Sequence, residues 1–300
     1  MARVVLISNP IASRTTPALT DTVLRTFRAG GWAVDWLETT RSLDARRFAE
    51  EAVRGGADVV AVLGGDGTTI QAAAGLVGTG VPLGLIPGGT GNVLAGNLRI
   101  PLGPIQAAEL ILRGRSRPID LGRLDRADGA HYFGVACGAG ADARVMGGTA
   151  ADIKRRIGIG GYFSTLFEHL PTIRSSPFRI TIDGETTESR AALVLVLNCG
   201  EIIPPLIRVS AAAVPDDGWF DVLVFGMDSP WQGIRGLVRV LANVALDTGE
   251  TGYLRYGRGR EITIEAASPQ PVQFDGDVIG ETPVTAIMQP SALQVMAPES

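Results

Sequence analysis

The sequence predicts an α/β N-terminal domain with a parallel sheet, followed by a mostly antiparallel, β-rich C-terminal domain. Two observations support this prediction. Apolar strand-like segments alternate with helical segments over about the first hundred residues, which is typical of a parallel sheet covered by helices. After about residue 117, β-rich segments succeed one another with turns such as Asp183-Gly184 between them. At 300 residues the chain is long for one hydrophobic core, so two domains are expected.

Strands and helices are expected to alternate through the N-terminal domain. The third strand is an unbroken apolar run rich in Val, which indicates burial on both faces. The third helix is expected to open at Thr68, because Thr68 and Gln71 fit the capping-box pattern. A fourth helix is expected to start near Asn92. The expected strands are residues 4–8, 32–37, 58–63 and 81–86, and the first two helices are residues 16–29 and 44–55.

The C-terminal domain is expected to be a sandwich or a partly closed barrel. Helices are expected to interrupt it over residues 150–171 and 230–246. The expected domains are residues 1–123 and 124–284, with residues 285–300 returning to the first domain. The expected later strands are residues 118–124, 131–136, 178–182, 191–198, 218–225, 261–264, 272–274, 285–288 and 293–296.

The motif Gly64-Gly65-Asp66-Gly67-Thr68 comes after the third strand, at the carboxyl edge of the predicted sheet. Its glycines remove the Cβ atoms that would keep a ligand away from the backbone, and a helix N-terminus suits a phosphate. A carboxylate repels phosphates unless a cation lies between them, so Asp66 indicates a nucleotide bound as its Mg²⁺ complex. The alternative is a plain turn in which Asp66 only caps the helix.

Three further polar turns are expected at the same edge of the sheet. They are Asn9-Pro10, Thr39-Thr40 and Pro87-Gly88-Gly89-Thr90-Gly91-Asn92, which come after the first, second and fourth strands. In open α/β sheets, ligands bind outside the carboxyl ends of the strands. Four polar turns facing one crevice therefore indicate a binding site more specifically than any one of them.

The composition bears on the class of partner and on the compartment. The net charge is −4, with 27 basic and 31 acidic residues, which gives no support for a nucleic-acid partner. Cys137 and Cys199 are expected to be buried free thiols, which fits a reducing compartment. The chain shows neither signal-peptide features nor a long apolar window. A cytoplasmic protein is therefore expected, with peripheral contact to the inner membrane face left open.

The ordered motifs resemble the bacterial branch of the diacylglycerol kinase catalytic family, lipid kinases related to sphingosine and ceramide kinases. The pentapeptide alone is shared with NAD kinases and resembles a phosphofructokinase loop, but the ordered set is more specific and spans nearly the whole chain. The matching motifs are Asn9-Pro10, Gly64-Gly65-Asp66-Gly67-Thr68, Pro87-Gly88-Gly89-Thr90-Gly91-Asn92, Asp120-Leu121-Gly122, Gly140-Ala141-Asp142-Ala143, Pro215-Asp216-Asp217-Gly218 and Asp275-Gly276-Asp277.

The resemblance implies an ATP-dependent kinase with a phosphofructokinase-like N-terminal domain, whose acceptor is a lipid alcohol such as diacylglycerol. The β-rich domain would supply the other wall of the cleft. Asn9 and Thr40 would lie near the nucleotide, and Asp66 would hold Mg²⁺. The residues that the resemblance places around the phosphates are Gly64, Gly65, Gly67, Thr68, Gly88, Gly89, Thr90 and Asn92.

The resemblance also implies a general base, which takes the proton of the acceptor hydroxyl. The family uses the carboxylate of a late Asp-Gly-Glu, and here Asp277 stands where the Glu is expected, one methylene shorter. Asp275 is the reserve candidate, and a simple β-turn is the structural alternative. A second departure is Val93, where many relatives carry an Asp; it affects which lipid head group fits or how the metal is held.

The sequence leaves several alternatives open. Asp217 resembles a position that holds a structural Mg²⁺ in some relatives, and an acidic hairpin turn explains it equally well. The basic run Lys154-Arg155-Arg156 and the apolar stripe of residues 231–241 fit either a membrane surface or ordinary folded structure. An NAD kinase and a non-catalytic nucleotide- or lipid-binding protein are the competing functions. The expected partner is a lipid substrate at a membrane surface, and a homodimer is left open.

Overall fold

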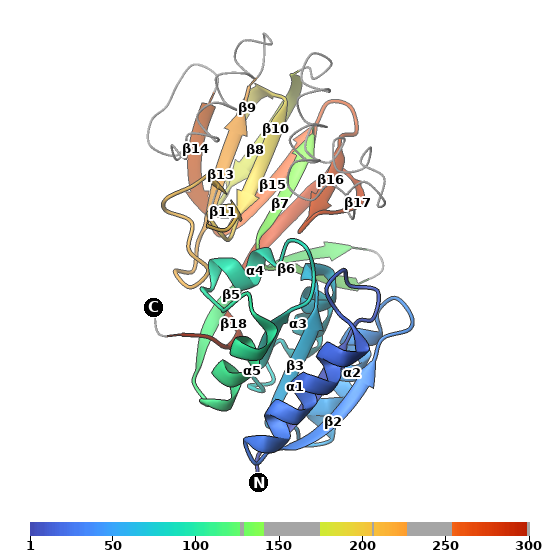
Figure 1. Ribbon diagram of the computed structural model, residues 1–300. Coiled ribbons are helices and arrows are strands. Elements are labelled where there is room, and N and C mark those ends of the chain that lie inside the picture. The colour runs from blue at the N-terminus through green and yellow to red at the C-terminus, as the bar shows by residue number, and fades with distance from the viewer. Residues whose placement is uncertain (127–128, 141–174, 206, 227–253, 299–300) are drawn as a thin grey trace. The chain divides into compact units, whose positions relative to one another are not determined.

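The computed structural model describes residues 1–126, 129–140, 175–205, 207–226 and 254–298 (Figure 1). The chain forms two compact units. The first comprises Met1–Asp120 and Ser291–Ser300, and the second comprises Leu121–Pro290. The sequence analysis placed the boundaries at residues 123 and 285, and the two units divide after Asp120 and after Pro290.

The first unit contains a parallel sheet in the order β2-β1-β3-β4. Residues 291–296 of the last strand add to it, because Val295 pairs in parallel with Leu83. Every residue of β3 is buried, as the apolar run predicted. The α/β class with a mostly parallel sheet is therefore confirmed. The strands are β1 (Arg3–Ser8), β2 (Ala33–Glu38), β3 (Val59–Gly64), β4 (Leu83–Pro87) and β18 (Val284–Met296).

Helices pack against this sheet in two sets. α1 packs with α5, and α2 packs with α3. The connection from β1 to β2 crosses the sheet in one direction, and the connections from β2 to β3 and from β3 to β4 cross it in the opposite direction. Because such connections are right-handed, α1 lies on one face of the sheet and α2 and α3 lie on the other. The sequence did not predict α5, although proline at a helix start is common. The helices are α1 (Pro17–Ala29), α2 (Asp44–Arg54), α3 (Asp66–Leu76), α4 (Val93–Asn97) and α5 (Pro104–Leu112).

The start of α3 corrects one prediction. The helix begins at Asp66 with Gly65 as its N-cap, and no side chain caps it, so the capping box of Thr68 and Gln71 is wrong. The Thr68 hydroxyl instead accepts a hydrogen bond from Asn9 Nδ2 at 2.8 Å. Gln71 Oε1 accepts one from the Leu43 N–H at 3.2 Å. Both side chains therefore join α3 to neighbouring loops.

The second unit contains two antiparallel sheets. In the first sheet the strand order is β18-β15-β8-β9, and β5 pairs with both β18 and β6. In the second sheet the order is β14-β13-β10-β7-β16-β17. Strands β11 and β12 pair with each other as a separate short hairpin. The strands are β5 (Ser116–Arg126), β6 (Gly129–Phe133), β7 (Ala136–Gly140), β8 (Ser176–Ile182), β9 (Glu185–Ala191), β10 (Leu193–Leu197), β11 (Glu201–Ile203), β12 (Ile207–Arg208), β13 (Phe220–Phe225), β14 (Leu254–Gly259), β15 (Glu261–Ala266), β16 (Pro271–Phe274) and β17 (Asp277–Glu281).

Side chains from both sheets form one core in the second unit, which confirms a sandwich. Two expectations were wrong in detail. The strand expected at residues 131–136 is broken at Gly134 and Val135 into β6 and β7, and the two strands expected at 285–288 and 293–296 are the single strand β18. The helices expected at 150–171 and 230–246, with Lys154-Arg155-Arg156, lie outside the described residues.

Gly122 carries a testable consequence for this core. A Cβ on Gly122 would overlap the ring of Phe133, which is fully buried and stacks on Phe220 with ring centroids 5.5 Å apart. We expect Gly122→Ala to lower the free energy of unfolding by about 1–3 kcal/mol, because the ring must leave its position. Urea denaturation measures this. The double variant with Phe133→Leu should cost less than the two single changes added together, and strict additivity would contradict the proposed clash.

Candidate active site

The two glycine-rich loops of the first unit lie directly against each other. The Gly88 N–H donates to the Gly64 carbonyl at 2.8 Å. A Cβ on Gly89 would lie 2.7 Å from the Cα of Gly65, and one on Gly88 would lie 3.1 Å from the Gly64 nitrogen. Side chains at these positions would push the loops apart. The glycines are thus required for contact between the loops, a reason that the sequence did not reveal.

The loop after β1 joins this pair. Asn9 donates from Nδ2 to Thr68 at 2.8 Å and accepts at Oδ1 from the Ile11 N–H at 3.0 Å. The hydroxyls of Ser13 and Thr90 lie 2.9 Å apart. The loops after β1, β3 and β4 therefore form one connected set at the carboxyl edge of the sheet, where the sequence predicted the site.

Asn92 shapes the second loop from within. Its Oδ1 accepts from the Gly89 N–H at 3.0 Å, and its Nδ2 donates to the Gly89 carbonyl at 2.7 Å. The residue is buried and adopts a left-handed conformation with φ of 48°, which asparagine tolerates better than most residues. The Asn92 side chain thus closes the loop that carries Gly88, Gly89 and Thr90.

Asp66 lies partly buried where these loops meet. Its Oδ1 accepts from the Leu94 N–H at 3.3 Å, at the start of α4. Burial raises the pKa of the Asp66 carboxyl, and the N–H groups of Leu94, Val93 and Asn92 oppose that rise. A cavity of about 10 Å³, enough for roughly one water molecule, lies beside the carboxylate between Thr69 and Asn92. The loops thus hold one carboxylate in a fixed position.

The donor set fits Mg²⁺ only in company with a phosphate ligand. Across the described residues, no group of three or more His, Cys, Asp or Glu side chains could hold a metal ion. Mg²⁺ is commonly bound through one or two carboxylates together with substrate phosphates and water, which Asp66 can satisfy. The buried Thr15 hydroxyl, beside Gly88, has no hydrogen-bond partner within the described structure. Sequence reasoning did not single it out, because nothing local marks it.

Thr40, expected near the nucleotide, is exposed after β2 and is held by Asp44. The Asp44 Oδ2 accepts from the N–H groups of Thr40 and Arg41, each at 2.9 Å, and from the Thr40 hydroxyl at 3.2 Å. Arg47 donates to the other oxygen at 3.0 Å. Asp44 was predicted only as the first residue of a helix, so its hold on this loop is a new observation.

Asp44 makes the stability of the first unit depend on pH. The Thr40 N–H, then Arg47 and the Arg41 N–H, hold the pKa of its carboxyl far below the ordinary value. The stability that it contributes is therefore complete above about pH 4 and is lost as the pH falls further, through the folded-state pKa.

We expect Asp44→Asn to be less stable than wild type at pH 7, with the gap closing below about pH 4. Urea denaturation at several pH values tests this. Asp21→Asn, which removes an exposed partner of Arg25, is the control; a gap that stays constant down to pH 2 would contradict the prediction.

Asp217 contacts protein groups in the second unit. Its carboxylate forms an ion pair with Arg258 and accepts from the Trp219 N–H at 3.0 Å. The Arg260 guanidinium lies 4.4 Å from the centre of the Trp219 ring. These contacts favour the hairpin-turn interpretation of Asp217, because a guanidinium already neutralises the carboxylate that a Mg²⁺ ion would need.

The late Asp-Gly-Asp motif forms the turn between β16 and β17. Asp277 is exposed at the start of β17. Asp275 accepts three backbone N–H groups, from Gly134, Val135 and Ala136. The turn alternative is thus correct for the backbone, and the two carboxylates have different surroundings. Asp66 belongs to the first unit and Asp277 to the second.

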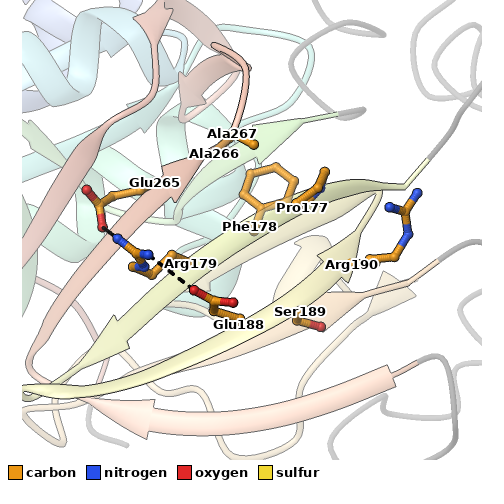
Figure 2. A pocket seen from close by; sticks show the side chains of 9 residues that line it. All are labelled: Pro177, Phe178, Arg179, Glu188, Ser189, Arg190, Glu265, Ala266 and Ala267. Carbon is orange, nitrogen blue, oxygen red and sulfur yellow. Dashed lines mark hydrogen bonds and ion pairs between the residues drawn. The ribbon is translucent and has the colours of Figure 1, made fainter.

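A separate hollow of about 550 Å³ lies in the second unit beside β8, β9 and β15 (Figure 2). Arg179 lies between Glu188, at 3.2 Å, and Glu265, at 4.0 Å, as the dashed lines show. These residues face one another across paired strands. The lining is mixed, because Pro177, Phe178, Ala266 and Ala267 also border the hollow beside these charged side chains.

Comparison with known proteins agrees with this fold. Residues 3–124 match the diacylglycerol kinase catalytic domain, and residues 135–297 match the YegS C-terminal NAD kinase beta sandwich-like domain. A diacylglycerol kinase of Mycobacterium tuberculosis is 31% identical over 85% of this chain and 82% of its own length. A diacylglycerol kinase of Bacillus subtilis is 26% identical over 87% of this chain and 84% of its own length. A crystal structure of a diacylglycerol kinase from Bacillus anthracis superposes with a TM-score of 0.75 at 23% identity, covering 99% and 97% of the two chains.

The matched catalytic domain and the kinase relatives define the class as a kinase, and this class implies ATP as a substrate. The chain belongs to the diacylglycerol kinase catalytic-domain family, and it is an ATP-dependent lipid kinase. The NAD kinase alternative is supported only by the description of the C-terminal sandwich. The non-catalytic alternative is set aside by the family assignment. No helix in the described ranges is long and apolar enough to cross a membrane.

Proposed function

We propose that the protein transfers the γ-phosphoryl group of ATP to the hydroxyl of a diacylglycerol-like lipid alcohol at a membrane surface. The observation that carries this proposal is the position of Asp66, whose carboxylate is fixed where the loops after β3 and β4 meet. Phosphoryl transfer depends mainly on positioning and on charge neutralisation, and a preformed set of loops supports both. Relatives named diacylglycerol kinase make that lipid the first acceptor to test.

In this proposal the first unit binds the nucleotide. Asn9 and Thr40 lie near the nucleotide, and Asp66 would hold Mg²⁺, which neutralises phosphate charge when bound. Asn9 also holds Thr68 in place, and Asp44 holds Thr40 in place. The backbone and side chains proposed around the phosphates are those of Gly64, Gly65, Gly67, Thr68, Gly88, Gly89, Thr90 and Asn92.

The second unit is proposed to supply the base. Asp277 accepts the proton of the acceptor hydroxyl as the new P–O bond forms. Its exposed carboxylate is open to a substrate, whereas both oxygens of Asp275 already accept N–H groups. We therefore favour Asp277 over the reserve candidate. A second Mg²⁺ at Asp217 is not part of the proposal, because Arg258 pairs with that carboxylate.

A phosphate-transfer screen with radiolabelled ATP tests the function. The acceptors are diacylglycerol, monoacylglycerol, phosphatidylglycerol, a sphingoid base and a polyketide-like alcohol, each presented in anionic vesicles with and without Mg²⁺. We expect Mg²⁺-dependent labelling, strongest with diacylglycerol. Labelling of another alcohol would change the acceptor but keep the reaction. Labelling of none, with ATP still bound, would overturn the proposal. Vesicle flotation in the same buffers measures binding at the membrane surface.

A further inference from the structure

The second unit contains two hairpin turns of the same build. Asp183-Gly184 joins β8 to β9, and Asp275-Gly276 joins β16 to β17. Asp183 and Asp275 have φ of 48° and 45°, and the glycines have φ of 88° and 92°. Positive φ at both central residues is typical of a two-residue type I′ turn. The turns differ in the residue that follows the glycine. This residue is Glu185 in the first turn and Asp277, the proposed base, in the second.

Asp275 makes more contacts than such a turn requires. Its Oδ2 accepts from the Gly134 N–H at 2.7 Å, and its Oδ1 accepts from Val135 at 2.9 Å and Ala136 at 3.0 Å. The Asp275 N–H also donates to the Ala136 carbonyl at 3.0 Å. Hydrogen bonds to an ionised acceptor are roughly twice as strong as neutral ones. The carboxylate therefore holds the turn to the break between β6 and β7.

Residues that follow β10 also hold the segment at Gly134 that Asp275 contacts. Asn198 comes directly after β10, and its Nδ2 donates to the Gly134 carbonyl at 2.8 Å. The buried Cys199 thiol donates to the same carbonyl at 3.3 Å. Within the hairpin itself, the Gly276 N–H donates to Gln273 Oε1 at 2.9 Å. The turn that precedes Asp277 is thus held by contacts to the break between β6 and β7 and by one contact within its own hairpin.

We propose that Asp275 is a positioning residue for phosphoryl transfer, because its carboxylate fixes the turn that presents Asp277. This inference rests on the proposed function, in which Asp277 is the base. A base acts only when it lies within hydrogen-bond reach of the proton that it takes. A loosened turn therefore lowers kcat and leaves ATP binding intact, since the proposed ATP contacts belong to the first unit.

The test compares Asp275→Asn with Asp183→Asn. Asparagine tolerates the left-handed conformation of Asp275. Its amide NH₂ replaces one accepting oxygen, however, so a donor then faces a backbone N–H group and that hydrogen bond is lost. Asp183 is the matched control, because its Oδ1 accepts from the N–H groups of Arg260 at 2.9 Å and Glu261 at 2.8 Å. We expect Asp275→Asn to lower kcat by about 10²-fold, with KM for ATP changed by less than about twofold. Asp183→Asn should keep kcat within about twofold of wild type. Equal losses of kcat in both variants would overturn the proposal.

A double variant separates positioning from a parallel role in catalysis. If Asp275 acts through Asp277, then Asp275→Asn adds no further loss of kcat to Asp277→Asn. Losses that multiply would overturn the proposal. Should Asp275→Asn fail to fold, Asp275→Glu keeps the charge but moves the carboxylate by one methylene. We expect Asp275→Glu to lower kcat, as Asp275→Asn does, and an unchanged kcat would overturn the positioning role.

Hydrogen exchange keeps this inference distinct from the function on which it rests. Asp275→Asn should speed amide exchange at residues 134–136 and 275–278, whereas Asp183→Asn should leave those amides unchanged. If wild type labels no lipid, or Asp277→Asn keeps full kcat, then the proposed function or its base fails. The exchange rates still decide whether Asp275 fixes the turn, and unchanged rates in Asp275→Asn would overturn that.

Discussion

Replacing Asp66 by Ala is expected to abolish phosphoryl transfer while the protein stays folded. The carboxylate lies at the junction of the two glycine-rich loops, and the proposed Mg²⁺ depends on it. Its loss removes charge neutralisation at the transferring phosphoryl group, and removal of a single electrostatic contact of this kind commonly costs about 10²–10³-fold in kcat. We expect a loss of at least about 10³-fold, measured with saturating ATP and diacylglycerol.

Asp66→Asn separates charge from loop structure. The amide oxygen can still accept the Leu94 N–H, now 3.3 Å from Oδ1, so α4 keeps its contact. We expect the Asn variant to lose activity nearly as fully as the Ala variant, with a smaller loss of thermal stability. An Asn variant that turns over at the wild-type rate would show that Asp66 serves α4 and not the metal.

The sequence was informative where local pattern and sheet geometry act together. The apolar run of β3 predicted a buried strand, and a parallel sheet brings the carboxyl ends of its strands to one edge. Asn9 and the two glycine-rich loops therefore had to lie close together, and hydrogen bonds now join them. The prediction needed only the order of elements and the composition of the turns.

The sequence was less informative where a side chain binds distant backbone. Asp275 accepts from amides that precede it by 139–141 residues, and nothing near it in sequence indicates that contact. Asp217 pairs with Arg258, 41 residues later, and that contact favours one of two interpretations that local sequence could not separate. The break of the expected strand 131–136 has the same origin, since its backbone N–H groups bind Asp275.

Asp277→Asn is expected to lower kcat by about 10²–10⁴-fold, the usual contribution of a general base. The acceptor hydroxyl must lose its proton as phosphorus bonds to its oxygen, and an amide cannot take that proton. Because the interaction forms only in the transition state, KM for ATP should change by less than about twofold. Steady-state kinetics at saturating lipid, with equilibrium ATP binding measured separately, distinguishes these two effects.

Asp277→Glu is the informative companion to that variant. It restores the residue that the family resemblance expects and extends the carboxylate by one methylene. Asp277 is exposed at the start of β17, so the longer side chain meets little steric resistance. We expect it to keep activity within about tenfold of wild type, because the carboxylate can still reach the proton directly or through one water molecule. If Asp277→Asn and Asp277→Glu both keep the wild-type kcat, no carboxylate at this position takes the proton, and the substrate's own phosphate oxygens become the acceptor to test.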